Sequence, residues 1–155
     1  MNRLLLIDSN TLFRKALRDI LSFKFPFLKI EEAATGKEGK QKIATFHPQL
    51  IFMDIQLPGE DGFKLACRIK AEHAEIIMVI FTSFHLEEYR TAALHAGIHH
   101  IIPKNLWSGH GILALVETLL SGPTKKHIDS SRETVPAEKG AIKKPQKKKK
   151  EDPAK

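Results

Sequence analysis

The chain has 155 residues, of which 42% are hydrophobic and 28% charged, and it carries a formal net charge of +7. The apolar fraction suffices for a packed core and excludes wholesale disorder, and the single cysteine, Cys67, excludes a disulfide framework and a cysteine-based zinc site. No apolar run approaches the roughly 18 residues of a membrane span. The first run, residues 4–7, stops at Asp8, too early for a signal peptide. We therefore expect a small cytoplasmic domain with no membrane span.

Short apolar runs rich in β-branched residues alternate along the chain with segments of helical period. In chain order the pattern predicts a strand at residues 4–7, a helix at 11–23, a strand at 28–33, a helix at 36–46, a strand at 50–53, a helix at 61–73, a strand at 76–81, a helix at 86–96, a strand at 100–102 and a helix at 108–120. Strict alternation of five strands and five helices predicts an α/β fold with a five-stranded parallel sheet covered on both faces.

The basic charge is concentrated near the end of the chain. Residues 121–155 hold 11 of the 25 Lys and Arg residues but only 5 of the 18 acidic ones. They contain no aromatic residue and no helical or strand period, which predicts a disordered basic tail after a domain at residues 1–120. The four lysines at 147–150 leave two interpretations open: a solubilising extension, or an arm that makes weak, sequence-indifferent contact with nucleic acid or an anionic surface.

Polar side chains follow four of the five predicted strands at the point where each strand ends: Asp8, Asp54, Thr82 and Lys104. Open parallel sheets bind their ligands outside the carboxyl ends of the strands. Each residue alone is unremarkable, since an aspartate after a strand often forms a turn or caps a helix. Together, two carboxylates, a hydroxyl and an ammonium group predict a site for Mg²⁺ and a phosphoryl group.

The segment at residues 53–62, MDIQLPGEDG, resembles the phosphoacceptor segment of two-component response regulator receiver domains. Residues 5–8 and 12–17 are similar to the first strand and helix of receivers in the NarL/FixJ branch. Residues 81–83, 87–89 and 96–97, together with Lys104, fall where that family has its threonine, fourth helix, glycine and lysine. The resemblance covers residues 2–120 and implies a flavodoxin-like, doubly wound sheet with strand order 2-1-3-4-5.

The resemblance also implies the chemistry of the site. Asp54 is expected to accept a phosphoryl group from a histidine kinase or phosphotransfer protein in a phosphorelay, and Mg²⁺ is expected to bind Asp8, Asp54 and the backbone carbonyl of Gln56. Lys104 and Thr82 are expected to contact phosphoryl oxygens, which suits phosphoryl transfer by positioning and charge neutralisation. The resemblance implies a signalling protein rather than an enzyme, a stand-alone receiver with a Lys-rich tail that acts through contacts with a downstream protein target.

The family's Lys-Pro pair is absent, because Pro103 precedes Lys104 and Asn105 follows it, and two further positions depart from the family pattern. Ser9 stands where receivers have a second acid after the first strand, so we expect weaker Mg²⁺ binding. Ile101 stands at the switch position of the fifth strand, where the family has an aromatic ring that moves with the threonine, here Thr82. The sequence therefore leaves three hypotheses: a phosphorylatable response regulator, a pseudo-receiver that binds partners without phosphorylation, or a receiver whose Lys-rich tail binds nucleic acid or an anionic surface.

Overall fold

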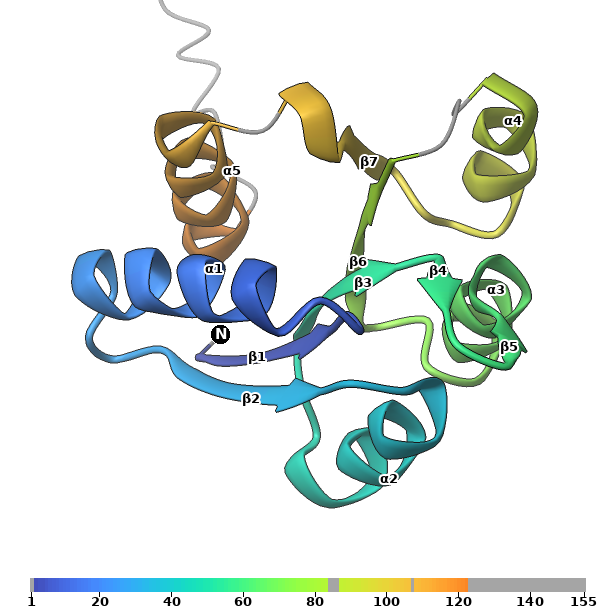
Figure 1. The fold of residues 1–155 in the computed structure, drawn as a ribbon, viewed down its shortest axis with the longest axis horizontal. Helices are drawn as coiled ribbons and strands as arrows, with labels where there is room; N and C mark the ends of the chain where they lie inside the picture. Colours follow the sequence, from blue (N-terminus) through green and yellow to red (C-terminus); the bar gives the residue numbers. More distant parts are fainter. Residues whose placement is uncertain (1, 84–86, 107, 123–155) are drawn as a thin grey trace, which may run out of the picture. The chain divides into compact units, whose positions relative to one another are not determined.

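The computed structural model describes residues 2–83, 87–106 and 108–122 (Figure 1). Its elements are β1 (Arg3–Ile7), α1 (Thr11–Lys24), β2 (Lys29–Ala33), α2 (Gly36–Phe46), β3 (Leu50–Asp54), β4 (Gln56–Leu57), β5 (Glu60–Asp61), α3 (Gly62–Glu72), β6 (Ile77–Thr82), α4 (Glu87–His95), β7 (His100–Pro103), the 3-10 helix η1 (Lys104–Leu106) and α5 (Gly109–Ser121). The predicted basic tail, beyond residue 122, lies outside the described residues.

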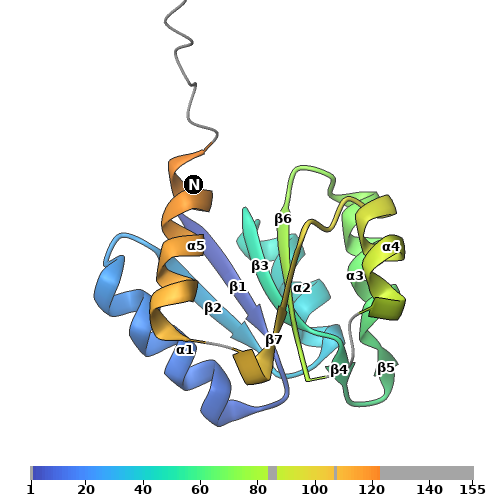
Figure 2. The same ribbon diagram turned by 90° about the horizontal axis from the view of Figure 1, so that it is seen from above.

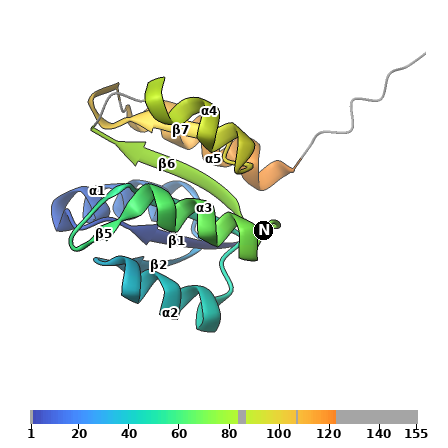
Figure 3. The same cartoon turned by 90° about the vertical axis from the view of Figure 1, so that its right-hand side faces the viewer.

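Five parallel strands form the main sheet in the order β2-β1-β3-β6-β7. Because β4 and β5 form a separate short hairpin, β6 and β7 are the fourth and fifth strands of the predicted series, and the expected order 2-1-3-4-5 is confirmed. Helices α1 and α5 cover one face of the sheet, and α2, α3 and α4 cover the other (Figure 1). Because the five strands are parallel, their carboxyl ends lie together at one edge of the sheet (Figure 3).

Alternate residues of each strand supply the two halves of the core. On β1, Leu4 and Leu6 belong to a buried cluster with side chains of α1 and α5, whereas Leu5 and Ile7 belong to the cluster with α2, α3 and α4. Strands buried on both faces read as continuous apolar runs, which is why the sequence indicates them clearly.

Four helices begin after a polar residue whose side chain accepts a hydrogen bond from a backbone N–H of the first turn: Asn10, Thr35, Asp61 and Ser108. Such caps satisfy donors that the helix itself leaves unpaired. The predicted helix starts at residues 61 and 108 are therefore one residue early, because Asp61 and Ser108 are caps rather than helical residues. Gly97 follows α4 with a φ of +78°, the left-handed conformation expected of a glycine after a helix. Within the described ranges, every helix is too short or too polar to cross a membrane.

Candidate functional site

Two buried carboxylates lie side by side at the carboxyl edge of the sheet. Ile7 of β1 pairs with Met53 of β3, so the next residues, Asp8 and Asp54, occupy neighbouring positions on adjacent strands. Each has only 4% of its surface exposed. Burying two carboxylates this close together is unfavourable unless hydrogen bonds and an opposite charge compensate them.

Backbone N–H groups fix one oxygen of each carboxylate. The N–H of Asn10 donates to Asp8 Oδ1 at 2.7 Å, and the N–H of Gln56 donates to Asp54 Oδ1 at 2.9 Å. Both bonds span two residues, the pattern of an Asx turn directly after a strand. The local chain therefore orients each carboxylate, and each keeps a second oxygen for another partner.

That partner is the same residue for both carboxylates. The Nζ atom of Lys104 lies 2.6 Å from Asp8 Oδ2 and 2.5 Å from Asp54 Oδ2. It also lies 4.6 Å from the centre of the Phe13 ring, a cation–π contact. Burial alone would lower the pKa of Lys104, but the hydrogen bonds and charges of Asp54 and Asp8 outweigh it and raise this pKa above its ordinary value. Lys104 is therefore a fixed cation at neutral pH.

Thr82 ends β6, the neighbour of β3 on the side away from Asp8. Phe81 pairs with Asp54, so Thr82 stands one residue beyond the carboxylate on the adjacent strand, and it is fully buried. Thr82 in turn pairs with Pro103, the residue before Lys104. The four residues predicted from the strand ends thus end or directly follow β1, β3, β6 and β7 and gather at one edge, as parallel strands require.

The two positions that depart from the family pattern lie in different surroundings. Ser9 is exposed and follows Asp8 directly, beside the site. Ile101 pairs with Ile80 and is half-buried against the cluster that contains Ala93 and Ile98. Ile101 therefore lies on the α4 side of the sheet, away from the carboxylates.

A short hairpin after Asp54 was not predicted from the sequence. Gln56 pairs with Asp61 and Leu57 with Glu60, around Pro58 and Gly59, whose φ is +69°. The Pro-Gly pair is typical of a tight turn and was the available signal. The next glycine, Gly62, is required by a close approach: a Cβ there would lie 2.3 Å from the carbonyl oxygen of Ile55. This packing fixes the backbone at Gln56.

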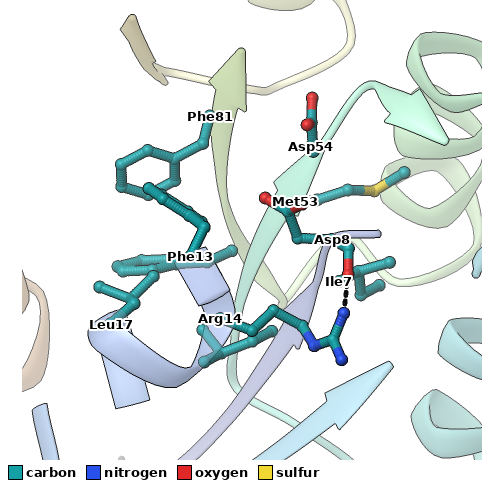
Figure 4. Close-up of a pocket in the computed structure, with 10 residues that line it drawn as sticks. Ile7, Asp8, Phe13, Arg14, Leu17, Met53, Asp54 and Phe81 are labelled. Atoms are coloured by element: carbon teal, nitrogen blue, oxygen red, sulfur yellow. Dashed lines mark hydrogen bonds between the residues drawn. The ribbon is translucent and has the colours of Figure 1, made fainter. Parts of the chain in front are cut away.

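Arg14 is a second feature of the site that the sequence did not indicate. Its guanidinium donates to the backbone carbonyl of Asp8 (Figure 4). Its Nε lies 3.4 Å from Glu32 of β2, an ion-pair distance without an aligned hydrogen bond. Arg14, Phe13 and Phe81 line a small cavity together with the two aspartates. Arg14 thus anchors the turn after β1, a role that depends on tertiary packing and leaves no mark in helical periodicity.

The donor set fits a hard divalent cation. Mg²⁺ is commonly held by one or two carboxylates and keeps several waters, and the site offers the two buried carboxylates of Asp8 and Asp54. Among the described residues there is no group of three or more His, Cys, Asp or Glu side chains placed to hold a metal. The residue after Asp8, Ser9, carries no carboxylate.

Comparisons with known proteins agree with this geometry. The family model described as "Response regulator receiver domain" matches residues 4–116. The chemotaxis protein CheY of Halobacterium salinarum is 32% identical over 102 residues, which cover 66% of this chain and 83% of that protein. A protein-glutamate methylesterase/protein-glutamine glutaminase of Nocardioides sp. is 30% identical over 105 residues, but the match spans only 28% of its length.

A solved structure of a CheY-like response regulator receiver domain protein from Methanospirillum hungatei superposes with a TM-score of 0.71 at 26% identity, covering 78% of this chain and 94% of that one. The fold, the site at the carboxyl edge and the family match lead to one conclusion. The chain belongs to the response regulator receiver domain family.

Proposed function

We propose that Asp54 accepts a phosphoryl group from a histidine kinase or phosphotransfer protein, and that the phosphorylated domain signals through contacts with a downstream protein. Receiver domains are signalling modules of two-component systems, and they are generally not enzymes themselves. The observation that carries the proposal is the bridging of Asp8 and Asp54 by the single ammonium group of Lys104. A cation held between two oriented carboxylates is placed to neutralise a phosphoryl group attached to either.

The order of the strands favours Asp54 over Asp8 as the acceptor. Asp54 lies on the central strand, between Asp8 on one side and Thr82 on the other. Asp8 has β2 on its outer side, where its backbone N–H donates to the carbonyl of Ala33, the last residue of that strand. Asp54 therefore has the Lys104 ammonium at its carboxylate and Thr82 on the adjacent strand, the two groups expected to bind phosphoryl oxygens.

In the proposed reaction an Asp54 carboxylate oxygen attacks the phosphorus of a phosphohistidine. A P–O bond forms as the P–N bond breaks. The electron pair of the broken P–N bond stays on the imidazole nitrogen, which then takes a proton from water. The Lys104 ammonium group, which donates to Asp54 Oδ2 before the reaction, then donates a hydrogen bond to a phosphoryl oxygen. The Thr82 hydroxyl donates to another phosphoryl oxygen. Preorganised charge of this kind is the main contribution a protein makes to phosphoryl transfer.

The receiver family generally binds Mg²⁺ at its phosphorylation site. In this chain Asp8, Asp54 and the backbone carbonyl of Gln56 would hold the ion, which when bound supplies further neutralisation of the phosphoryl oxygens. The hairpin β4–β5 and Gly62 support this role, since they fix the backbone at Gln56.

For the output of the signal, we propose that Thr82 and Ile101 mark the switch positions. The family's aromatic ring at this position moves into the space that the threonine leaves, and Ile101 has no such ring. We therefore expect the conformational change on phosphorylation to centre on the loop after Thr82. The pseudo-receiver hypothesis is favoured by Ser9 and Ile101, two of the departures from the family pattern. Whether Asp54 can be phosphorylated distinguishes a phosphorylatable response regulator from a pseudo-receiver.

The test is incubation of the full chain with acetyl phosphate and Mg²⁺, followed by intact-mass measurement. We expect a single phosphate adduct, its loss in Asp54→Asn, and its retention in the control Asp19→Asn, which removes an exposed carboxylate on α1. An adduct that persists in Asp54→Asn would show that another residue is the acceptor. Absence of any adduct, both with acetyl phosphate and with a cognate kinase, would favour the pseudo-receiver.

A further inference from the structure

The guanidinium group of Arg14 connects the turn at Asp8 to the edge strand β2. It donates to the backbone carbonyl of Asp8 (Figure 4), and its Nε lies 3.4 Å from Oε1 of Glu32. Only 12% of the Arg14 side chain is exposed, so its charge requires a compensating carboxylate close by. Among the residues that the structure describes, Glu32 is the one carboxylate within ion-pair distance of Arg14. The position of Arg14 therefore depends on Glu32.

Glu32 lies on the face of the sheet that α1 covers. It pairs with Leu6, which belongs to the core cluster on the side of α1 and α5, so the two side chains share that face. Helix α1 lies along β2 there (Figure 2). Arg18, one helical turn after Arg14, donates to Oε2 of Glu32 at 2.9 Å. The two arginines of α1 thus contact both carboxylate oxygens of Glu32.

The backbone of Asp8 is fixed by three contacts. Its N–H donates to the carbonyl of Ala33 at 3.0 Å, and its Oδ1 accepts the N–H of Asn10 at 2.7 Å. Its carbonyl accepts from the Arg14 guanidinium, the one contact of the three that a side chain of another element makes. Without Arg14, the peptide between Asp8 and Ser9 would lose the contact that sets its orientation, and the direction of the Asp8 carboxylate would change with it.

The binding of Mg²⁺ is sensitive to the direction of its ligands. The ion demands near-ideal octahedral geometry, and groups that orient metal ligands typically change the metal affinity roughly 10–100-fold. Because Ser9 carries no carboxylate, the two carboxylates of Asp8 and Asp54 must both be well placed.

We propose that Glu32 is a positioning residue for the Mg²⁺ site: through Arg14 it holds the turn that presents the Asp8 carboxylate to the ion. The inference rests on the proposed role of Asp8 in binding Mg²⁺ and adds a residue of the neighbouring strand. An effect of charge alone has the opposite sign at Arg14. A positive charge near the site repels Mg²⁺, so its removal would strengthen binding, whereas the loss of a positioning residue weakens binding.

The test is titration of the full chain with Mg²⁺ by isothermal titration calorimetry at constant ionic strength. Glu32→Gln keeps the shape of the side chain and removes its charge. Arg14→Lys keeps the charge but loses the planar group that reaches Asp8 and Glu32 together. The matched control is Glu31→Gln, because Glu31 is the preceding residue of β2, lies on the opposite face and pairs with Lys42 at 3.2 Å.

We expect about tenfold weaker Mg²⁺ binding in Glu32→Gln and in Arg14→Lys, and unchanged binding in Glu31→Gln. A second measurement needs no metal. Hydrogen exchange of the Asn10 amide, which donates to Asp8 Oδ1, should be faster in Glu32→Gln and Arg14→Lys than in the unchanged chain and the control. Urea unfolding of each variant verifies that it is folded under the conditions of the titration.

Three outcomes would overturn the inference. Unchanged Mg²⁺ affinity in Glu32→Gln would mean that Glu32 does not act on the site. Equal weakening in Glu31→Gln, or tighter binding in Arg14→Gln, would indicate an effect of charge without positioning.

The variant Asp8→Asn separates this inference from the proposed function. Mg²⁺ binding that depends on Asp8 but not on Glu32 would overturn the inference alone. If Asp8→Asn binds Mg²⁺ as well as the unchanged chain, or neither binds it, the proposed metal site is wrong, and the exchange of the Asn10 amide then decides whether Glu32 positions the turn.

Discussion

Replacing Lys104 with methionine should destabilise the domain more than any other single lysine substitution in an ion pair of the described residues. The change keeps the length of the apolar stem but removes the ammonium group, which leaves Asp8 and Asp54 as two adjacent carboxylates, each 4% exposed, without their shared cation. A comparable pair at the surface, Lys15 with Asp19, has side chains that are 73% and 62% exposed.

The magnitude follows from these environments. Removing one partner of a buried ion pair costs about 3–5 kcal/mol, since it strands an uncompensated charge. The side chain of Lys104 keeps 15% of its surface exposed, so water can partly replace it and the lower end applies, about 3 kcal/mol. For Lys15→Met we expect less than about 1 kcal/mol, the usual value of an exposed pair. Against a typical domain stability of roughly 5–15 kcal/mol, the first change is severe and the second is minor.

The assay is urea unfolding followed by far-ultraviolet circular dichroism at pH 7 in the presence of EDTA. The pKa of Lys104 is raised, so its stabilising contribution is fully present below the ordinary lysine pKa of about 10.4 and is lost only as the pH rises through the higher folded value. Measurement at pH 7 therefore captures the whole effect. Adding Mg²⁺ should restore much of the lost stability, because a ligand that binds only the folded state stabilises it.

Two comparisons make the prediction refutable. Lys104→Arg retains the charge and should cost less than Lys104→Met, and Asp8→Asn in the Lys104→Met background should recover stability by removing one of the stranded carboxylates. If Lys104→Met costs no more than Lys15→Met in EDTA, the ammonium group does not compensate the two carboxylates, and the electrostatic reasoning is wrong.

Three further predictions follow from individual residues. Ser9→Asp should bind Mg²⁺ more tightly than the unchanged chain by isothermal titration calorimetry; equal affinities would mean that position 9 does not contribute to the metal site. Gly62→Ala should cost about 1–3 kcal/mol in urea unfolding, because its Cβ meets the backbone of Ile55; an unchanged stability would mean that this close approach can relax. Burial, with the nearby charge of His99, lowers the pKa of His100, so the folded state favours the neutral imidazole. The stability should therefore fall as the pH drops below about 6.5. His100→Asn should reduce this pH dependence of stability, and an unchanged dependence would mean that other groups cause it.

Most of the site could be predicted from the sequence because parallel strands bring their carboxyl ends to one edge. Asp8, Asp54, Thr82 and Lys104 each follow an apolar run, so locating the runs was enough to place the residues together. The second strand was the weakest prediction. Its central residues, Glu31 and Glu32, are paired with Lys42 and with arginines of α1, which suits an edge strand with one open side but interrupts the apolar pattern.

What the sequence did not indicate depends on tertiary contacts. A strand of two residues, such as Gln56–Leu57, has no period to detect, so the hairpin after Asp54 was missed. Arg14 resembles any polar residue of an amphipathic helix until its guanidinium is seen at the carbonyl of Asp8. Lys104 was expected to contact a phosphoryl group, and only the structure shows it bridging both carboxylates.

The neutral residue at position 9 is expected to favour the stability of the metal-free domain and to weaken the binding of Mg²⁺. In the described structure two carboxylates face one ammonium group, so the site carries a formal charge of −1. An aspartate at position 9 would raise that to −2 beside buried groups, which strengthens the attraction for Mg²⁺ but adds repulsion when no metal is bound. Ser9→Asp should therefore lower the stability in EDTA and raise the response of stability to Mg²⁺. If it raised stability in EDTA, the carboxylate would be pairing with another cation, and Ser9 would no longer explain a weak metal site.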